Sequence, residues 1–330
     1  MGKLTSSMIN GMIGAIVLPG FVACAEAKPV LRSGTTNGIL SVGNLKRTYR
    51  IHLPPRYDDK TRLPLVIVLH GFGGNGRNGL EQGKWIEKSE REGFLVVGPE
   101  GVLKQPGQRE SFLRNPRSWN SGPKETPAAV RQVDDVGFMR ALIDHLLATG
   151  WVDENRIYVT GFSNGAAMTF RVGLELSDRI AAIAPVSNTL LVQPQPLQRP
   201  VSLLLLFGTA DPINPMTGGQ VTRSGQTITR PAAIDSWKTW AQLLQCPAEP
   251  QIIYDRDGVK GRAFRPCTAD AEALFYTVEG MGHVWPGGRN YLPERTIGKS
   301  SNAIDATDLI WEFFRRHPKK QIRASLGIGL

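Results

Sequence analysis

The sequence predicts an α/β fold in which a mostly parallel sheet carries helices on both faces. Continuous apolar runs suited to buried parallel strands alternate along the chain with segments of helical periodicity. The 330 residues, of which 41% are hydrophobic, are enough to bury one large core. We find no internal repeat, heptad run or long low-complexity tract, so one domain is the economical interpretation.

The strands are predicted from alternating or continuous apolar runs. Segments 39–42 and 49–53 alternate like paired opening strands, joined by a turn at Gly43 and Asn44. The run LVIVL at 65–69 is apolar throughout, as in a strand buried on both faces. Further strands are expected at 94–97, 156–160, 180–186, 202–207 and 274–278.

Helical patterns fall between these strands. The clearest starts near Asp134 and Asp135, places apolar residues between Val136 and Leu147 on one face, and closes at Gly150. We expect both aspartates to cap this helix. Other helices are expected directly after Ser163, at 234–244 and at 304–314.

Residues 1–27 are predicted to be a secretory signal peptide. Lys3 precedes an apolar segment at 8–22, and small residues at 23–27 offer a cleavage site. That segment is shorter than the roughly 20 residues a membrane helix needs, so we expect no stable membrane span. Residues 28–330 would then form a single domain with a basic C-terminal tail, and the protein would be secreted or periplasmic. Lipid attachment at Cys24 is the alternative, although Phe21 is bulkier than the residue usual in lipoprotein signals.

The cysteines fit an exported protein. If Cys24 is lost or lipidated, Cys246 and Cys267 remain, and in an oxidising compartment they can form a bridge. A disulfide that closes the short loop between these two cysteines would stabilise the fold by about 3 kcal/mol in the loop-entropy model. Three cysteines and no closely spaced histidine pair predict no metal site.

The net charge of +10 raises the question of nucleic acid. The basic residues are scattered, and no recognition helix, finger or aromatic-basic motif accompanies them. We therefore expect a solvated basic surface and no nucleic-acid partner. Loose attraction to anionic polymers is the alternative.

The most informative motif is GFSNG at residues 161–165, which follows the β-branched run 156–160 and opens a helical segment. The G-x-S-x-G pattern is a nucleophile elbow, in which a sharp strand-to-helix turn exposes the serine hydroxyl. Small residues are needed on both sides because larger ones would collide with the neighbouring strand or helix. Ser163 is the predicted nucleophile, with a structural tight turn as the alternative.

The general base is found by elimination among five histidines. His52 lies in an early strand, His145 in a helix on the flank of the sheet, and His317 at the end of the terminal helix. His70 belongs to a glycine-rich turn. His283 remains, in a loop after the last strand, and is the predicted base; a hydrogen-bonded loop histidine is the alternative reading.

A serine nucleophile and a histidine base usually work with an acidic residue as the third member of a catalytic triad. This acid should lie between the serine and the histidine in sequence, at the end of another strand. Asp211 follows an apolar strand and a glycine turn, so its carboxylate could orient the imidazole. Asp235 is the nearest rival, but it falls where a helix should begin and is better explained as a cap. An Asx-turn at the loop start is the alternative for Asp211.

Two backbone N–H groups are predicted to form the oxyanion hole. One is that of Asn164, directly after the nucleophile. The other comes from the glycine-rich turn HGFGGN at 70–75, where we favour Phe72. This turn lacks the lysine and the spacing of a phosphate-binding loop.

Seven motifs together resemble the secreted polyhydroxybutyrate depolymerase and feruloyl esterase family. They are HGFGG at 70–74, GPEG at 98–101, SWN at 118–120, VDDV at 133–136, GFSNG at 161–165, GTAD at 208–211 and GHVWPGG at 282–288. The resemblance spans roughly residues 38 to 316. It implies an α/β-hydrolase fold, ester hydrolysis through an acyl-enzyme without a cofactor, a triad of Ser163, Asp211 and His283, and a bridge between Cys246 and Cys267. Phe72 departs from the smaller or sulfur-containing residue of many relatives, and we expect no separate polymer-binding module.

The substrate is predicted only by class. We expect His70, Trp119 and Trp285 to line the pocket, since indoles supply flat apolar area for an aromatic or hydroxyalkanoate group; core packing is the alternative for the two tryptophans. The ester would be a hydroxyalkanoate polymer or oligomer, or a feruloylated polysaccharide. An acetylxylan-type esterase, a peptidase of the same fold and a catalytically silent binding protein are the competing hypotheses.

Overall fold

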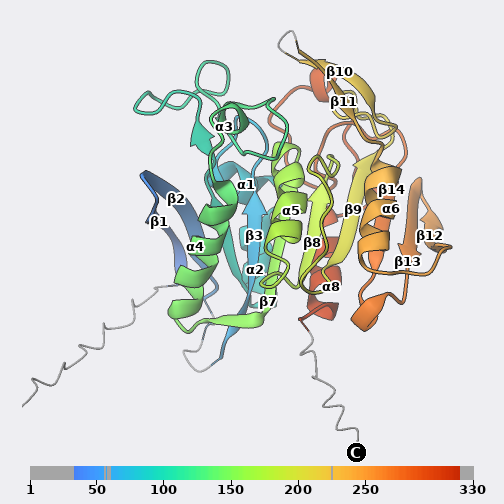
Figure 1. The fold of residues 1–330 in the computed structure, drawn as a ribbon, viewed down its shortest axis with the longest axis horizontal. Helices are drawn as coiled ribbons and strands as arrows, with labels where there is room; N and C mark the ends of the chain where they lie inside the picture. Colours follow the sequence, from blue (N-terminus) through green and yellow to red (C-terminus); the bar gives the residue numbers. More distant parts are fainter. Residues whose placement is uncertain (1–32, 56, 58–60, 224–225, 320–330) are drawn as a thin grey trace, which may run out of the picture. The chain divides into compact units, whose positions relative to one another are not determined.

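The structure is a computed structural model that describes residues 33–55, 57, 61–223 and 226–319. The predicted signal peptide, Cys24 and the end of the basic tail lie outside these residues. A ten-stranded sheet in the order β1-β2-β4-β3-β7-β8-β9-β14-β13-β12 forms the centre of the described part (Figure 1). Strands β4 to β14 in that order run parallel to one another, and antiparallel strands extend the sheet at both ends. The predicted α/β-hydrolase fold is confirmed.

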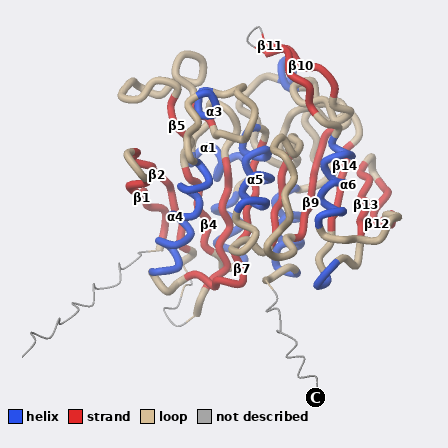
Figure 2. Tube along the Cα trace, in the orientation of Figure 1, coloured by secondary structure: helices blue, strands red, loops and turns tan. Residues whose placement is uncertain are grey.

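The strands of this sheet are β1 (Gly34–Val42), β2 (Leu45–Leu53), β3 (Leu63–Leu69), β4 (Leu95–Pro99), β7 (Val152–Phe162), β8 (Ala182–Val186), β9 (Ser202–Gly208), β12 (Gln251–Arg256), β13 (Val259–Phe264) and β14 (Ala273–Val278). Two small antiparallel pairs lie outside it: β5 (Val102–Leu103) with β6 (Arg117–Ser118), and β10 (Gly219–Arg223) with β11 (Gln226–Arg230). Figure 2 separates these strands from the long loops above the sheet.

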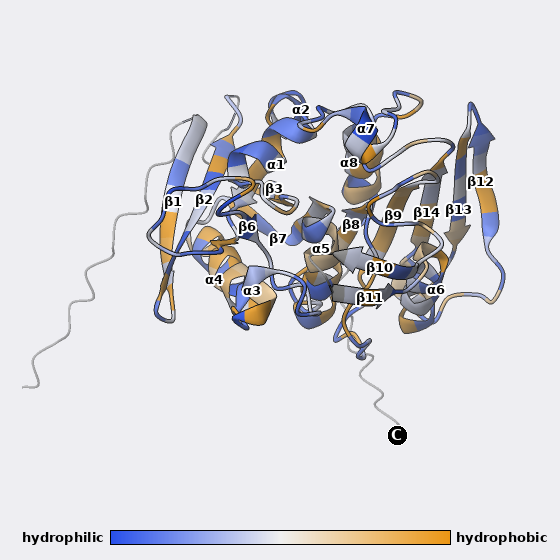
Figure 3. Ribbon diagram, turned by 90° about the horizontal axis from the view of Figure 1, so that it is seen from above, coloured by the Kyte–Doolittle hydropathy of each residue, from blue (hydrophilic) through white to orange (hydrophobic). Residues whose placement is uncertain are grey.

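The helices are α1 (Gly76–Gln82), α2 (Trp85–Glu92), α3 (Pro127–Val130), α4 (Asp135–Ala148), α5 (Asn164–Glu175), α6 (Ala233–Leu243), α7 (Glu294–Ile297) and α8 (Ala306–Arg316), with a 3-10 turn at Thr268–Asp270. Viewed from above, α1, α2 and α8 cover one face of the sheet, and α4, α5 and α6 cover the other (Figure 3).

The apolar pattern of β3 explains this three-layer arrangement. Leu65 and Ile67 pack into the core shared with α4, α5 and α6, whereas Val66 and Val68 pack into the core shared with α2 and α8. Successive side chains of a strand point to opposite faces, so a strand covered on both sides must be apolar at every position. The sequence run LVIVL meets this requirement.

The start of α4 corrects one prediction. Asp134 caps the helix as expected, because its Oδ1 accepts a hydrogen bond from the N–H of Gly137 at 2.7 Å. Asp135 does not act as a cap. Its carboxylate is fully buried, pairs with Arg47 at 2.7 Å and accepts the N–H of Asn120 at 2.7 Å. Burial raises the pKa of Asp135, while Arg47 and Asn120 oppose that rise.

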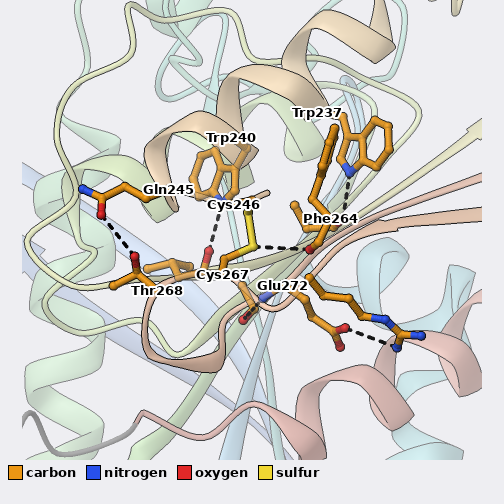
Figure 4. The surroundings of a disulfide bond; sticks show 12 residues. Trp237, Trp240, Gln245, Cys246, Phe264, Cys267, Thr268 and Glu272 are labelled. Atoms are coloured by element: carbon orange, nitrogen blue, oxygen red, sulfur yellow. Dashed lines mark hydrogen bonds and ion pairs between the residues drawn. A yellow bond between two sulfur atoms is a disulfide. The ribbon is translucent and has the colours of Figure 1, made fainter. Parts of the chain in front are cut away.

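The predicted bridge between Cys246 and Cys267 is present (Figure 4). Cys246 follows the end of α6, and Cys267 lies between β13 and β14. The two indole N–H groups of α6 anchor this helix to the sheet, with Trp237 donating to the carbonyl of Ala273 and Trp240 to that of Val201. The disulfide therefore ties α6 to the segment that leads into β14.

Candidate active site

Ser163 occupies a strained turn between β7 and α5. Its backbone has φ 55° and ψ −118°, a region that a residue with a Cβ rarely adopts and that costs on the order of 1–3 kcal/mol. The N–H of Ser163 donates to the carbonyl of Val186 at 3.0 Å, which ties the turn to the neighbouring strand β8. The fold therefore supports a serine conformation that the local chain alone would not choose.

The two glycines of the motif are required by close backbone approaches. A Cβ at Gly161 would lie 2.5 Å from the carbonyl oxygen of Gly165. A Cβ at Gly165 would lie 2.1 Å from the carbonyl oxygen of Leu69 on strand β3. Both separations are far below a van der Waals contact, so alanine at either site would force the elbow away from the sheet.

Ser163, His283 and Asp211 form one hydrogen-bonded chain. Ser163 Oγ lies 2.8 Å from His283 Nε2, and His283 Nδ1 lies 2.7 Å from Asp211 Oδ2. The other carboxylate oxygen of Asp211 accepts the N–H groups of Ile213 and Asn214, both at 2.8 Å. A carboxylate facing Nδ1 favours the tautomer with the proton on that nitrogen, which leaves Nε2 to accept the serine proton.

The structure thus unites three residues that lie far apart in sequence, at the carboxyl ends of β7, β9 and β14. Close backbone packing fixes the two loops that follow β9 and β14. A Cβ at Gly208 would lie 2.2 Å from the carbonyl oxygen of Met281, and the N–H of His283 donates to Ile297 at 2.5 Å. The imidazole is further held against the Phe162 ring, with centroids 4.7 Å apart.

His70 is held as a neutral imidazole and is not placed to act as the base. Its Nδ1 donates to the carbonyl of Gly71 at 2.7 Å, and its Nε2 accepts the N–H of Gly101 at 2.9 Å. Burial lowers the pKa of His70 to about 4, and the nearby Arg117 and Arg47 act in the same direction. His70 is among the residues that line the cleft, and its ring joins the turn at Gly71 to the segment at Gly101.

Phe72 lies in the glycine-rich turn that follows His70. The next two N–H groups already have acceptors. Gly73 donates to the backbone carbonyl of Arg117 at 2.8 Å, and Gly74 donates to the backbone carbonyl of Gly71 at 3.1 Å. Within the described residues, no acceptor is bound to the N–H of Phe72 or of Asn164. A Cβ at Gly71 would lie 3.5 Å from Ser163 Cβ, so this turn packs directly against the elbow.

The side chain of Asn164 fixes the segment after β6. Its Oδ1 accepts the N–H of Trp119 at 2.8 Å, and its Nδ2 donates to the carbonyl of Trp119 at 3.3 Å and to Ser121 Oγ at 3.1 Å. Asn164 therefore joins the elbow to the segment that follows β6.

The prediction that Trp119 and Trp285 line the pocket is wrong, and the alternative of core packing describes both. Trp119 is fully buried and its indole N–H donates to the carbonyl of His70 at 2.9 Å. Trp285 is 3% exposed and its N–H donates to Thr307 Oγ1 at 3.1 Å. A buried N–H needs an acceptor, and each indole has one, while neither tryptophan is among the residues that line the cleft.

A cleft of about 900 Å³ has Ser163 in its lining, together with both apolar and polar side chains. Exposed apolar side chains gather at its mouth: Phe72, Phe112, Leu113, Tyr291 and Leu292. Polar and charged side chains form another part of the wall: Ser121, Glu125, Thr126, Asn188 and Arg230. The cleft can accept a ligand with one apolar part and one hydrogen-bonding part.

None of the five polar-wall residues was predicted from the sequence, and three of them are linked by hydrogen bonds: Glu125, Asn188 and Arg230. Arg230 ends the β11 strand and pairs with Glu125 at 2.5 Å, although the two residues are 105 positions apart. Nothing in the local sequence distinguishes these residues from surface polar residues, because their importance arises only when distant loops meet. A buried arginine in an active-site cleft is visible only in the folded chain.

Within the described residues, no group of three or more histidine, cysteine, aspartate or glutamate side chains could hold a metal ion. The same part of the chain contains no helix with both the length and the apolar character needed to cross a membrane.

Comparison with known proteins places these features in a family. The profile of a phospholipase/carboxylesterase family matches residues 57–228. NocK of Nocardia uniformis subsp. tsuyamanensis, provisionally named an esterase, is 24% identical over 304 residues, which cover 87% of this chain and 85% of that protein. Feruloyl esterase B of Piromyces equi is 28% identical over 247 residues, which cover 72% of this chain and 43% of that longer protein.

Among solved structures, an acetyl xylan esterase from Aspergillus awamori superposes with a TM-score of 0.56. The match covers 85% of this chain and 99% of that chain at 14% sequence identity. A likeness at this identity concerns the fold alone.

Proposed function

Because the chain belongs to the phospholipase/carboxylesterase family and is a carboxylic ester hydrolase of the α/β-hydrolase fold, we propose that it is a serine esterase acting through an acyl-enzyme. One observation carries this proposal: the unbroken hydrogen-bond chain from Ser163 Oγ through His283 to Asp211, at the base of a cleft of about 900 Å³.

In the proposed cycle, Ser163 Oγ attacks the ester carbonyl while His283 Nε2 takes its proton. The imidazolium then protonates the leaving alcohol, and the acyl group stays on the serine oxygen. Water attacks the acyl-enzyme with His283 again as the base, which releases the acid and restores the serine. Asp211 stabilises the imidazolium and keeps the ring oriented towards Ser163, without itself taking a proton.

The N–H groups of Phe72 and Asn164 are the proposed oxyanion hole. Both lack an acceptor within the described residues and both lie on segments that pack against Ser163. Each donor to a tetrahedral oxyanion is worth about 10² to 10³ in rate, because it is already oriented when the charge develops.

For the substrate, we propose an ester that joins an aromatic acyl group to a carbohydrate. The apolar mouth suits the planar ring of a hydroxycinnamoyl group, and the wall with Glu125, Asn188 and Arg230 suits hydroxyl groups. A relative named feruloyl esterase supports this class. An acetyl group alone would leave most of the cleft empty, and a hydroxybutyrate oligomer is the competing ester.

We further propose that residues 1–27 direct export and that residues 28–330 act as one catalytic domain. The disulfide supports this, since such bonds persist mainly in oxidising compartments. Mass spectrometry of the protein from a secreting host tests it. A mature N-terminus between residues 24 and 28 is expected, whereas an intact N-terminus would contradict export by cleavage, and a lipid mass on Cys24 would favour anchoring.

The decisive experiment compares the parent with Ser163→Ala on methyl ferulate, methyl acetate and a hydroxybutyrate oligomer. The parent should cleave methyl ferulate with the highest kcat/KM, and Ser163→Ala should lose activity on all three. Turnover by Ser163→Ala equal to that of the parent would disprove the mechanism. A preference for the hydroxybutyrate oligomer would keep the mechanism and replace the substrate class.

A further inference from the structure

The peptide bond between Ser163 and Asn164 has two roles in this site. Its N–H is the proposed oxyanion donor, and its carbonyl oxygen is buried in hydrogen bonds on the opposite side. Because a peptide unit is planar, fixing the direction of the carbonyl also fixes the direction of the N–H. The groups that bind the Ser163 carbonyl therefore fix the direction in which the Asn164 N–H points.

Asn188 is the side chain that binds this carbonyl. Its Nδ2 donates to Ser163 O at 2.9 Å, in addition to the first helical N–H groups of Ala166 and Ala167 at 2.9 and 3.1 Å. The Asn188 side chain is buried, with 3% of the residue exposed. The helical bonds begin α5, whereas the bond from Asn188 ties the peptide to the loop after β8.

The orientation of the Asn188 amide follows from its neighbours. Its Oδ1 faces two donors, the N–H of Thr189 at 2.9 Å and Arg230 Nη1 at 3.1 Å. Only the oxygen can accept both bonds, so the NH₂ group must face the Ser163 carbonyl. The amide cannot flip without breaking all three interactions.

Arg230 places a positive charge behind this amide. Its side chain is 3% exposed and is held by Glu125, whose side chain is 12% exposed, at 2.5 Å. A cation bound to Oδ1 polarises the Asn188 amide and strengthens its NH₂ donor, and the same polarisation passes through the Ser163 carbonyl to the N–H of Asn164. A buried ion pair carries a desolvation cost, which fits a role beyond stability.

We propose that Asn188, supported by Arg230 and Glu125, is a positioning residue that orients and polarises the Ser163–Asn164 peptide for the oxyanion. This inference rests on the proposed serine-esterase mechanism. It extends the catalytic machinery to the β10–β11 hairpin, whose last residue is Arg230. A direct contact with substrate is the competing explanation, since Asn188 and Arg230 also line the cleft.

The test uses two variants at the central position. Asn188→Asp keeps the acceptor for Arg230 and for the Thr189 N–H but removes the donor to Ser163, and Asn188→Ala removes the donor without adding charge. Both should lower kcat by about 10- to 100-fold, with KM and the melting temperature close to the parent values. Thr189→Val is the matched control, because Thr189 Oγ1 is buried and has no hydrogen-bond partner within the described residues.

A second measurement separates positioning from packing. A trifluoromethyl ketone forms a tetrahedral adduct with the serine, and its oxyanion occupies the hole. Its affinity should fall across the variants by the same factor as kcat/KM. Arg230→Gln should show a smaller loss of both ketone affinity and kcat/KM, on the order of tenfold or less. Arg230→Lys should recover part of that loss.

The inference is overturned if Asn188→Ala keeps the parent kcat, if only Asn188→Asp is impaired, or if KM rises while ketone affinity stays constant. The first result removes the donor from the mechanism, the second indicates charge repulsion, and the third indicates a substrate contact. Failure of the esterase proposal is distinguishable, because it would appear as an inactive parent or an active Ser163→Ala.

Discussion

Asp211 uses its two carboxylate oxygens for different tasks. Oδ1 accepts the N–H groups of Ile213 and Asn214, and Oδ2 faces His283 Nδ1 at 2.7 Å. In Asp211→Asn, the amide oxygen should keep the two backbone bonds, so the NH₂ must face Nδ1. That reverses the imidazole tautomer and puts the proton on Nε2. We expect kcat to fall by about 10⁴ with an unchanged melting temperature, measured by steady-state kinetics and thermal unfolding.

A loss of less than tenfold in Asp211→Asn would show that the acid is elsewhere. Asp235→Asn provides the comparison, since Asp235 lies in the first turn of α6 and its side chain should affect helix stability rather than catalysis.

Gly165 shows steric need overriding helix propensity. Alanine in a helix is favoured over glycine by about 1 kcal/mol, but a Cβ at Gly165 would lie 2.1 Å from Leu69 O. We expect Gly165→Ala to lower the free energy of unfolding by about 1–3 kcal/mol or more. Gly79→Ala in α1 is the control, because its Cβ would lie 3.5 Å from His70, an ordinary contact. Chemical denaturation should find Gly79→Ala neutral or stabilising; equal losses would refute the steric argument.

Buried His70 predicts a pH dependence of stability. Its pKa is lowered from 6.5 to about 4, so between these values the unfolded chain binds a proton that the folded chain does not. The free energy of unfolding is therefore highest above pH 6.5. It falls by about 3 kcal/mol in total as the pH drops towards 4. Urea unfolding from pH 7 to 4.5 should show this slope, and His70→Asn should flatten it.

His52 adds to the same slope, because burial also lowers its pKa while Glu90 and Glu87 oppose the shift. His52→Gln therefore serves as the comparison for His70→Asn. If the two variants flatten the curve equally, the contribution assigned to His70 is wrong.

At the scale of elements, the sequence predicts what is buried on both faces and misses what depends on distant partners. The run at 65–69 lies within β3, and the helix after Ser163 is α5. The β10–β11 and β12–β13 hairpins were not predicted, because none of their strands carries a long apolar run like that of β3, and β12 has only exposed and half-buried residues. Asp135 was assigned to a cap because its partner Arg47 is 88 residues away in sequence.

The disulfide links two elements and should contribute stability rather than chemistry. Cys246 and Cys267 are 21 positions apart, and closing such a loop stabilises the fold by about 3 kcal/mol. The loops that carry Asp211 and His283 have their own backbone contacts, so the triad should persist without the bond. We expect Cys246→Ala/Cys267→Ala to melt at lower temperature with a kcat near that of the parent.

Thermal unfolding with and without a thiol reductant checks the disulfide prediction. The reductant should lower the melting temperature of the parent and leave the double variant unchanged. A double variant that melts like the parent would show that the bond adds no stability, and a large loss of kcat would show that it also orders the site.

At the scale of the whole molecule, the cleft mouth is assembled from three separate segments. Phe72 comes from the turn after β3, Phe112 and Leu113 from the loop between β5 and β6, and Tyr291 and Leu292 from the loop after His283. Apart from Phe72, which belongs to the glycine-rich turn, no local pattern marks these residues, and the sequence predicted two buried tryptophans as pocket walls instead. A large aromatic residue in a single sequence signals apolar area but does not reveal whether that area faces solvent.

This arrangement predicts a selective effect on aromatic acyl groups. Leu113 is 86% exposed and Phe112 is 45% exposed, so Phe112→Ser and Leu113→Ser should not disturb the core. Covering such apolar surface by a bound ring is worth on the order of 1–2 kcal/mol, so KM for methyl ferulate should rise by about tenfold. Methyl acetate is too small to reach the mouth, and its KM should be unchanged. Ile252→Ser, at a 73% exposed position on β12, is the control and should alter neither constant. Both KM values are measured by pH-stat titration. Equal changes in KM for the two esters would show that the mouth does not bind the acyl group, and would indicate that it binds the alcohol part of the ester instead.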